Sequence, residues 1–284
     1  MNPFAADQSV FSPPRETILR PGGAGRWGNL AELWQYRDLL WRLGMRDVQL
    51  RYKQTLLGAS WAVIQPVMMM IVFSLVFGRM LGVATDVDVP YPIFVYAGLL
   101  PWTFFSGIVQ GASLSLVNNA GMLRKIYFPR LVMPLASVVA PGVDLVMAMM
   151  VLLGMMLFYG VDMSWQLLLL PVVSASVMFA ALGIGVALSA LTVSYRDVKH
   201  VIPYLIQLGL FVTPVIYPLE MAQDWAWLMG LNPMAGPVGA FRAAVLDQPI
   251  DWFAWGQSTA VAGALLPVSL WLFFRNERQF ADVV

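Results

Sequence analysis

Residues 46–78 read RDVQLRYKQTLLGASWAVIQPVMMMIVFSLVFG, a charged segment that passes directly into a long apolar run. No Asp, Glu, Lys or Arg occurs from Gln54 to Gly78. An apolar stretch of this length suffices for a helix to cross the roughly 30 Å hydrocarbon core of a bilayer. The run therefore predicts a first membrane span at 57–79, with a charged helix leading into it.

The same pattern recurs along the chain. Hydrophobic residues make up 59% of the sequence and charged residues only 12%, whereas roughly a quarter of the residues in a soluble domain are charged. Most of the later apolar stretches carry no charge, and the one from Leu131 to Tyr159 is interrupted only by Asp144. We predict an all-α polytopic membrane protein with six transmembrane helices, at about 57–79, 91–117, 131–159, 165–193, 200–219 and 252–274.

Basic residues fall almost entirely in alternate gaps between these spans. With six spans, one side of the membrane holds 15 of the 17 Lys and Arg, and the other side holds only Arg79 and Arg242. That second side carries seven carboxylates: Asp86, Asp88, Asp162, Glu220, Asp224, Asp247 and Asp251. Because cytoplasmic loops are enriched in Lys and Arg, both termini are predicted to be cytoplasmic.

The segment before the first span divides into two parts. Residues 1–28 are rich in Pro and Gly and are interpreted as a flexible cytoplasmic tail, followed by a single transmembrane domain over 29–284. Residues 30–53 predict an amphipathic helix along the cytoplasmic membrane surface, with Asp38–Arg42 and Asp47–Arg51 spaced for ion pairs on one turn. The alternative is a helix of a soluble subdomain. The predicted apolar face comprises Leu30, Leu33, Trp34, Leu40, Trp41, Met45, Val48 and Tyr52.

Residues 220–251 are as long as a span but are broken by Asn232, Pro233, Gly236 and Pro237. Two short helices of this kind reach only halfway through the bilayer, so we predict a re-entrant hairpin on the outer side. Irregular backbone at membrane depth must be buried in protein or line water. The hairpin is therefore a candidate pathway or gate.

Two further features bear on helix packing. Gly107 with Gly111, and Ala181 with Gly185, are spaced to allow close helix crossings, although such pairs also occur by chance. Asp144 is costly in lipid and is expected to face protein or water. A local packing hydrogen bond near Ser137 or Pro141 and a role in transport are both open for it.

Several kinds of chemistry are missing from the sequence. The three lysines follow Tyr52, Arg124 and Val198, so no Lys follows Gly as a P-loop requires, and no ATP site is expected in this chain. The absence of Cys, and a single His at His200, leave little scope for a metal site, and we expect no cofactor. The basic residues form no patch that would indicate nucleic-acid binding.

Six motifs, in this order, resemble the permease subunits of ABC-2 type exporters, in the branch that exports O-antigen, capsule or teichoic-acid polysaccharide. They are RDVQLRYKQTLLGASWAVIQPV (46–67), YAGLLPWTFF (96–105), KIYFPR (125–130), YRDV (195–198), TPVIYP (213–218) and LNPMAGP (231–237). The resemblance covers about residues 30–278 and implies a bacterial inner-membrane homodimer. It also implies a separate nucleotide-binding ATPase, in two copies, that binds ATP and Mg.

The resemblance implies a role for each group of site residues. The loop 118–130, otherwise only a positive-inside anchor, would dock on the ATPase through an exposed basic and aromatic set: Arg124, Lys125, Tyr127, Phe128 and Arg130. The hairpin would be the outer gate, at Asn232, Pro233 and Met234. A glycan on an undecaprenyl pyrophosphate carrier would slide along aromatic rings, for which the candidates are Trp61, Tyr96, Trp102, Phe104, Phe105 and Tyr217. The alternative for any of these aromatics is an interfacial belt or lipid-facing packing. Because a pyrophosphate favours nearby Arg, our own hypothesis is that Arg46, Arg51 and Lys53 contact it at the cytoplasmic entrance.

Two alternatives to glycan export remain open at this point. An ABC-2 permease for a drug or a lipid would have a closed lateral pocket in place of a continuous aromatic tunnel. A stand-alone membrane enzyme or channel would need no ATPase.

Overall fold

The computed structural model describes residues 33–53, 58–82 and 89–276, apart from 124, 127, 196, 220 and 222–224. Within these ranges every regular element is a helix. The predicted tail 1–28, the start of the predicted surface helix, and Arg124 and Tyr127 of the predicted docking loop lie outside the described residues. The helical elements, in chain order, are α2 (Arg37–Tyr52), η2 (Gly58–Ser60), α3 (Trp61–Phe73), η3 (Ser74–Met80), α4 (Tyr91–Asn118), α5 (Ala120–Leu123), α6 (Val132–Ala136), α7 (Val139–Tyr159), η5 (Trp165–Leu169), α8 (Leu170–Ser194), α9 (Val198–Val212), α10 (Ala226–Leu231), α11 (Ala235–Val245) and α12 (Trp252–Asn276).

Among the described residues, five continuous helical stretches are long and apolar enough to cross a membrane. They are Gly58–Met80, Tyr91–Asn118, Val132–Tyr159, Trp165–Ser194 and Trp252–Asn276, and each matches a predicted span closely. The all-α polytopic fold is therefore confirmed. The predicted span at 200–219 is not found as one regular helix, because α9 ends at Val212 and Thr213 adopts an extended conformation before Pro214.

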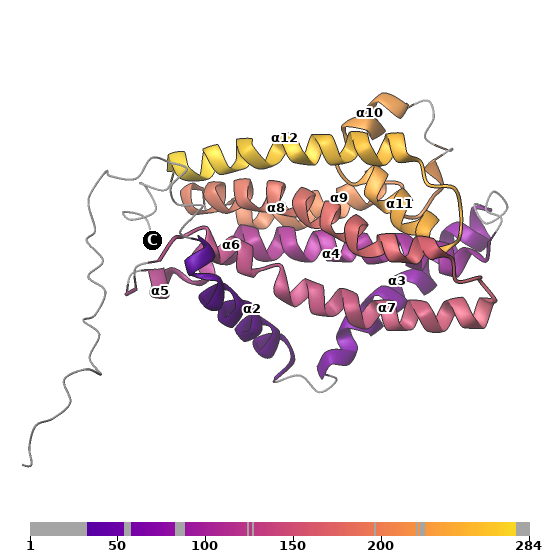
Figure 1. Ribbon diagram of the computed structural model, residues 1–284, viewed down its shortest axis with the longest axis horizontal. Coiled ribbons are helices and arrows are strands. Elements are labelled where there is room, and N and C mark those ends of the chain that lie inside the picture. The colour runs from indigo at the N-terminus through magenta and orange to yellow at the C-terminus, as the bar shows by residue number, and fades with distance from the viewer. Residues whose placement is uncertain are drawn as a thin grey trace, which may run out of the picture.

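Helix α4 forms the centre of the bundle. It packs against α8, α7, α3 and α11, and α8 in turn packs against α12, so that α12, α8, α4 and α7 lie side by side in Figure 1. Small residues permit these crossings. A Cβ on Gly185 would lie 2.7 Å from the Cβ of Ala112, and a Cβ on Gly107 would lie 3.0 Å from Cγ of Pro141. Gly107 and Gly185, one from each small-residue pair, thus lie at close helix contacts.

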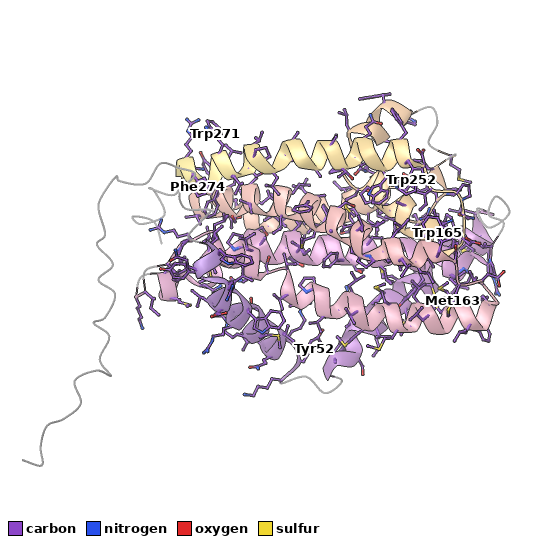
Figure 2. All side chains as sticks on the ribbon, in the orientation of Figure 1. Tyr52, Met163, Trp165, Trp252, Trp271 and Phe274 are labelled. Atoms are coloured by element: carbon purple, nitrogen blue, oxygen red, sulfur yellow. The ribbon has the colours of Figure 1, made fainter. Side chains whose placement is uncertain are left out.

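The two ends of the bundle carry different elements. Figure 1 places α5, α6 and the last turn of α12 at one end, and α10 and α11 at the other. Exposed tryptophans mark both ends: Trp165 and Trp252 lie near the hairpin end, and Trp271 lies at the opposite end (Figure 2). Tryptophan is enriched where helices leave the bilayer core, so this distribution fits a membrane-spanning bundle.

Helix α2 lies obliquely across the outside of the bundle (Figure 1) and packs against α6 and α7. The side chains that face the protein are centred on the buried Leu43, with Leu39 and Leu40 beside it. Trp34 and Trp41, which the helical wheel placed on the same apolar face, are exposed. The predicted face is therefore wrong in part, because one flank of it packs on the bundle and the other points outward.

Candidate functional site

The C-terminal end of α2 meets α7 in a cluster of three polar side chains. The guanidinium of Arg51 donates to Oδ2 of Asp144, and the hydroxyl of Tyr52 donates to Oδ1 of the same carboxylate. Asp144 is the only Asp or Glu within the five long helical stretches. The free-energy cost of placing this carboxylate in an apolar environment is offset, because both of its oxygens accept hydrogen bonds from donors on α2.

This cluster corrects a local expectation. The spacing of Asp47 and Arg51 suggested an ion pair within α2, but Asp47 accepts from Arg46 at 2.9 Å, while Arg51 turns to Asp144. Burial, followed by the hydrogen bond to Asp144, raises the pKa of Tyr52. The phenol therefore remains a hydrogen-bond donor at neutral pH. The local packing hydrogen bond left open for Asp144 is made to α2 and not to Ser137, whose hydroxyl donates to the carbonyl of Pro134.

A cavity of about 400 Å³ lies beside the cluster, between α3, α4 and α7. We call it the polar cavity. Arg51, Tyr52 and Asp144 line one part of it. The rest of its wall combines two of the predicted channel aromatics, Trp61 and Phe104, with hydrogen-bonding groups from Gln65, Thr103, Ser106 and Gln110. Aromatic faces next to polar side chains suit a ligand that has both C–H faces and hydroxyls.

A second cavity, of about 470 Å³, lies between α2, α4 and α7. Arg46 and Arg51 both line it, and Arg46 also donates to the side chain of Asn119 at 2.8 Å. Arg51 lines the polar cavity as well, so it stands at the boundary of the two spaces. Two of the three predicted phosphate contacts are thus brought together, whereas Lys53 is exposed and lines neither cavity.

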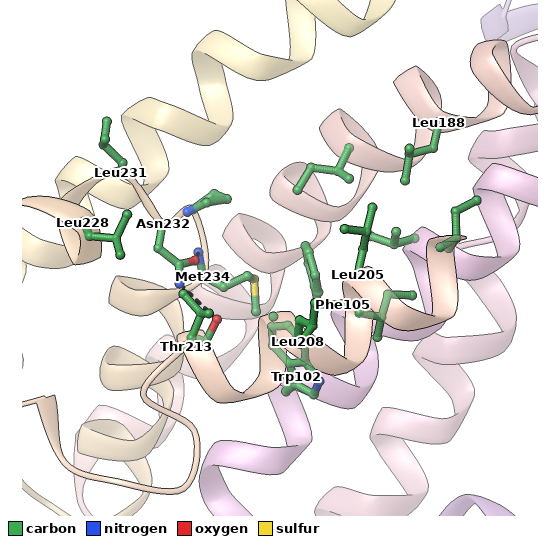
Figure 3. A pocket seen from close by; sticks show the side chains of 17 residues that line it. Trp102, Phe105, Leu188, Leu205, Leu208, Thr213, Leu228, Leu231, Asn232 and Met234 are labelled. Atoms are coloured by element: carbon green, nitrogen blue, oxygen red, sulfur yellow. Dashed lines mark hydrogen bonds between the residues drawn. The ribbon is translucent and has the colours of Figure 1, made fainter. Parts of the chain in front are cut away.

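The third cavity, of about 430 Å³, is almost entirely apolar and lies between α4, α8, α9 and the hairpin (Figure 3). We call it the apolar cavity. Trp102 and Phe105 line it from α4, and Leu205 and Leu208 line it from α9. Phe105 and Phe104, neighbours in sequence, therefore belong to different cavities.

The six predicted channel aromatics do not share one wall within this chain. Trp61 and Phe104 line the polar cavity, and Trp102 and Phe105 line the apolar cavity. Tyr96 is fully enclosed in the core, where its hydroxyl donates to the carbonyl of Ala148 at 3.2 Å. The placement of Tyr96 on a channel surface is therefore wrong for this structure. The hydroxyl of Tyr217 lies 3.2 Å from each of the carbonyls of Phe211 and Val212, at the end of α9.

The predicted break in residues 220–251 is present and lies between α10 and α11. The side chain of Asn232 donates to the hydroxyl of Thr213 at 3.0 Å and accepts from the backbone N–H of Met234 at 2.9 Å. The first of these bonds is the dashed line in Figure 3. Asn232, Pro233 and Met234 line the apolar cavity, but Met234 is only 1% exposed. The hairpin therefore contacts the end of α9 through Asn232 and Thr213.

Arg242 was not singled out by the sequence motifs, yet it is buried, unlike the other charged residues of the hairpin that the structure describes. It lies on α11 and donates to the carbonyls of Pro214 at 2.9 Å and Val215 at 2.7 Å. The turn it holds is the one that ends α9. An Arg alone in the apolar stretch AGPVGAFRAAV was the available signal, because a charge in such a helix needs a specific partner.

The predicted docking loop differs from expectation at its aromatic residue. Phe128 is only 4% exposed and packs with Leu43 of α2 and Leu116 of α4 in a second apolar cluster. The expectation that Phe128 protrudes is therefore wrong, since the loop folds back on the bundle. Lys125 and Ile126 are exposed among the described residues of the loop, Ile126 by 57%. Arg130 is partly buried.

Comparison with known proteins decides the family. The family model described as ABC-2 type transporter matches residues 38–246. The chain is a member of the ABC-2 type transporter family. The match runs from α2 to the end of α11, so it includes the Arg51–Asp144 cluster, all three cavities and the hairpin.

Relatives of this ABC-2 type chain have been named for polysaccharide export. It is 31% identical over 258 residues to the O-antigen export system permease protein RfbA of Myxococcus xanthus, covering 89% of this chain and 98% of that protein. A protein of the same name from Klebsiella pneumoniae is 25% identical, covering 87% of this chain and 95% of its own length. The polysialic acid transport protein KpsM of Escherichia coli is 24% identical, covering 72% of this chain and 80% of that protein. The resemblance stated from the motifs is confirmed.

Proposed function

We propose that this chain is the permease subunit of an ABC exporter that moves an undecaprenyl pyrophosphate-linked polysaccharide across the bacterial cytoplasmic membrane. The observation that carries the proposal is the match to O-antigen export permeases over nearly the whole of both chains. The site geometry supports it, because one cavity combines aromatic rings, neutral hydrogen-bonding groups and an arginine. Neither a metal nor another cofactor enters the proposal for this chain.

The polar cavity suits a sugar chain for a physical reason. Trp61 and Phe104 offer ring faces on which sugar C–H groups stack without a fixed hydrogen-bond pattern, so a polymer could slide along them. Gln65 and Gln110 offer donors and acceptors that different hydroxyls could use in turn. Arg46 and Arg51, five residues apart near the end of α2, would meet the pyrophosphate of the carrier lipid.

A homodimer would complete the pathway. Within one chain the candidate aromatics face two separate cavities, so a continuous tunnel requires a second surface. Helix α9 offers such a surface, since Tyr204, Leu208 and Phe211 are exposed along it. In the proposed assembly α9 serves as the sixth span, together with the turn that follows it.

The energy for transport would come from two copies of a nucleotide-binding ATPase subunit on the cytoplasmic side. The end of the bundle that carries α5 and α6 has the exposed Lys125, Lys199 and Arg275 near it, as the positive-inside rule requires of the cytoplasmic face. Lys125 and Ile126 would contact the ATPase, with α2 as a second contact. Both termini would then be cytoplasmic, and the hairpin would face outward as the gate.

A second candidate function is export of a drug or a lipid. The apolar cavity favours it, because a space of about 430 Å³ with an almost wholly apolar wall could hold an acyl chain or a hydrophobic small molecule. The two functions differ in what disappears when the gene is deleted. Polysaccharide export predicts loss of surface polymer and accumulation of lipid-linked polymer inside the cell, restored by the wild-type chain. Normal surface polymer in the deletion strain, with loss of a drug or lipid efflux, would favour the second candidate.

A further inference from the structure

The Arg51–Asp144 pair has a feature that a purely structural ion pair does not need. The side chain of Arg51 is 45% exposed and that of Asp144 is 25% exposed. Arg51 lines both the polar cavity and the cavity between α2, α4 and α7, while Asp144 lines the polar cavity. A ligand that enters either space can therefore reach the pair from the side.

The chemistry of the pair matches that of the substrate proposed above. A guanidinium binds a carboxylate and a phosphate through the same planar arrangement of N–H donors. Asp144 presents one carboxylate oxygen to Arg51 and the other to Tyr52, as two oxygens of a diphosphate could, but with a smaller negative charge. Tyr52 donates to the same carboxylate and could donate equally to a phosphate oxygen.

We infer that Asp144 is an internal stand-in for the diphosphate group of the substrate. In the empty permease it neutralises Arg51 and holds the guanidinium at the boundary of the two cavities. An arriving prenyl diphosphate displaces the carboxylate and takes over Arg51 and Tyr52. This inference rests on the proposed function, because it assumes that a diphosphate-bearing lipid enters beside α2.

Displacement would also change how α2 is held. The end of α2 contacts α7 through Arg51 and Tyr52, and both side chains would leave Asp144 when the diphosphate binds. One attachment of α2 to the bundle would then be exchanged for a bond to the substrate. Binding of the substrate would in this way change the contacts of α2, the helix that is proposed to face the ATPase.

The test is equilibrium binding of farnesyl diphosphate to the full-length chain in lipid nanodiscs, with farnesol as the uncharged comparison. Asp144→Asn removes the competing charge at nearly constant shape, so diphosphate binding should tighten at least threefold. Arg51→Gln should weaken it at least tenfold. In the Arg51→Gln background, Asp144→Asn should tighten binding less than it does in the wild type, because only Tyr52 is then left to be released. Farnesol binding should not change in any variant.

Two controls separate this mechanism from a general change in charge or in folding. Asp162→Asn removes a carboxylate that is exposed and follows α7 at its other end, so it should leave diphosphate binding unchanged. Asp144→Ser provides a second neutral variant should the Asn variant lose its fold, and it should tighten binding in the same direction. Thermal unfolding of each variant confirms that the bundle is intact.

The outcomes that overturn the inference are distinct from those that overturn the proposed function. Unchanged or weaker diphosphate binding in folded Asp144→Asn and Asp144→Ser, with polymer export intact in the wild type, defeats the stand-in alone. Equal tightening by Asp144→Asn in the Arg51→Gln background defeats it too, because the effect would not pass through Arg51. A wild-type chain that binds farnesyl diphosphate no better than farnesol overturns the diphosphate entrance and the inference together.

Discussion

The guanidinium of Arg242 lies over the ring of Phe94, with 3.8 Å between the guanidinium carbon and the ring centroid. This contact joins α11 of the hairpin to α4 at the centre of the bundle. The same guanidinium donates to the carbonyls of Pro214 and Val215, while the hydroxyl of Tyr91 donates to the carbonyl of Ile216 at 2.6 Å. The turn after α9 is therefore held by side chains from two other helices.

Replacement of Arg242 should destabilise the hairpin end of the molecule. Arg242→Met keeps most of the side-chain volume but leaves the carbonyls of Pro214 and Val215 without this donor. We expect the free energy of unfolding to fall by about 2–4 kcal/mol, since each buried carbonyl left unsatisfied costs roughly 1–3 kcal/mol. Unfolding in mixed micelles measures this change in the free energy of unfolding. Arg79→Met, at an exposed position, is the matched control and should change little; equal losses in the two variants would count against the bracing role.

Gly98 should not tolerate a methyl group. A Cβ at this position would lie 2.5 Å from the carbonyl oxygen of Val215 and 2.6 Å from Nη2 of Arg242. Gly98→Ala should therefore push the turn away from α4 and lower the free energy of unfolding by about 1–3 kcal/mol, as overpacking does elsewhere. Gly154→Ala in α7 meets no atom within 4 Å and should be neutral or slightly stabilising. A Gly98→Ala protein as stable as the Gly154→Ala protein would contradict the close approach.

Substitutions at exposed and at buried positions of the docking loop should have different effects, the first on ATPase binding and the second on stability. Lys125→Glu with Ile126→Glu changes two exposed positions, so the chain should fold normally but bind its ATPase about tenfold more weakly or worse. Co-purification from cells that express both subunits measures the binding. Phe128→Ala should instead lower the free energy of unfolding by about 3–5 kcal/mol, because Phe128 packs in a buried cluster. Normal co-purification with the double Glu variant would remove Lys125 and Ile126 from the ATPase contact.

Cysteine labelling should report the orientation of the bundle. The chain has no Cys, so a single introduced cysteine has no background. A cysteine in place of Leu231, which is 60% exposed, should react with a membrane-impermeant maleimide added outside the cell. A cysteine in place of Lys125 should react only after the membrane is permeabilised. Met234→Cys should resist the outside reagent, since the side chain of Met234 in the hairpin is buried. The reverse pattern at positions 231 and 125 would invert the proposed topology.

The long helices could be predicted from the sequence because composition alone decides them. A run of apolar residues in a bilayer has to form a helix, since every backbone polar group must be satisfied internally. The span predicted at 91–117 and the helix Tyr91–Asn118 accordingly agree almost residue for residue. The end of α9 was harder to place, because hydropathy continues past Val212. The Thr213–Pro214 sequence carried the stop signal, and the contacts that hold the turn come from distant helices.

The candidate site was predictable in its residue types but not in its pairings. Arg51 and Asp144 were both singled out, but 93 positions separate them in the sequence. The nearer carboxylate of Asp47 satisfied the local helical rule equally well. The difference is physical, since Asp47 reaches solvent more readily than a carboxylate in an apolar helix and has less need of Arg51. The prediction that Phe128 is exposed was wrong for a related reason, because the local sequence does not indicate whether an aromatic side chain in a basic loop points toward the bundle.

The most direct test of the proposed function is transport by the purified components. The chain and its partner ATPase would be reconstituted in liposomes whose outer leaflet contains the cell's own undecaprenyl pyrophosphate-linked polysaccharide. The proposal predicts that ATP drives the polymer into the lumen, protected from an added glycosidase, and that omitting either subunit abolishes this protection. Protection that needs no ATPase, or ATP turnover that moves a lipid or drug but leaves all polymer accessible, would contradict it.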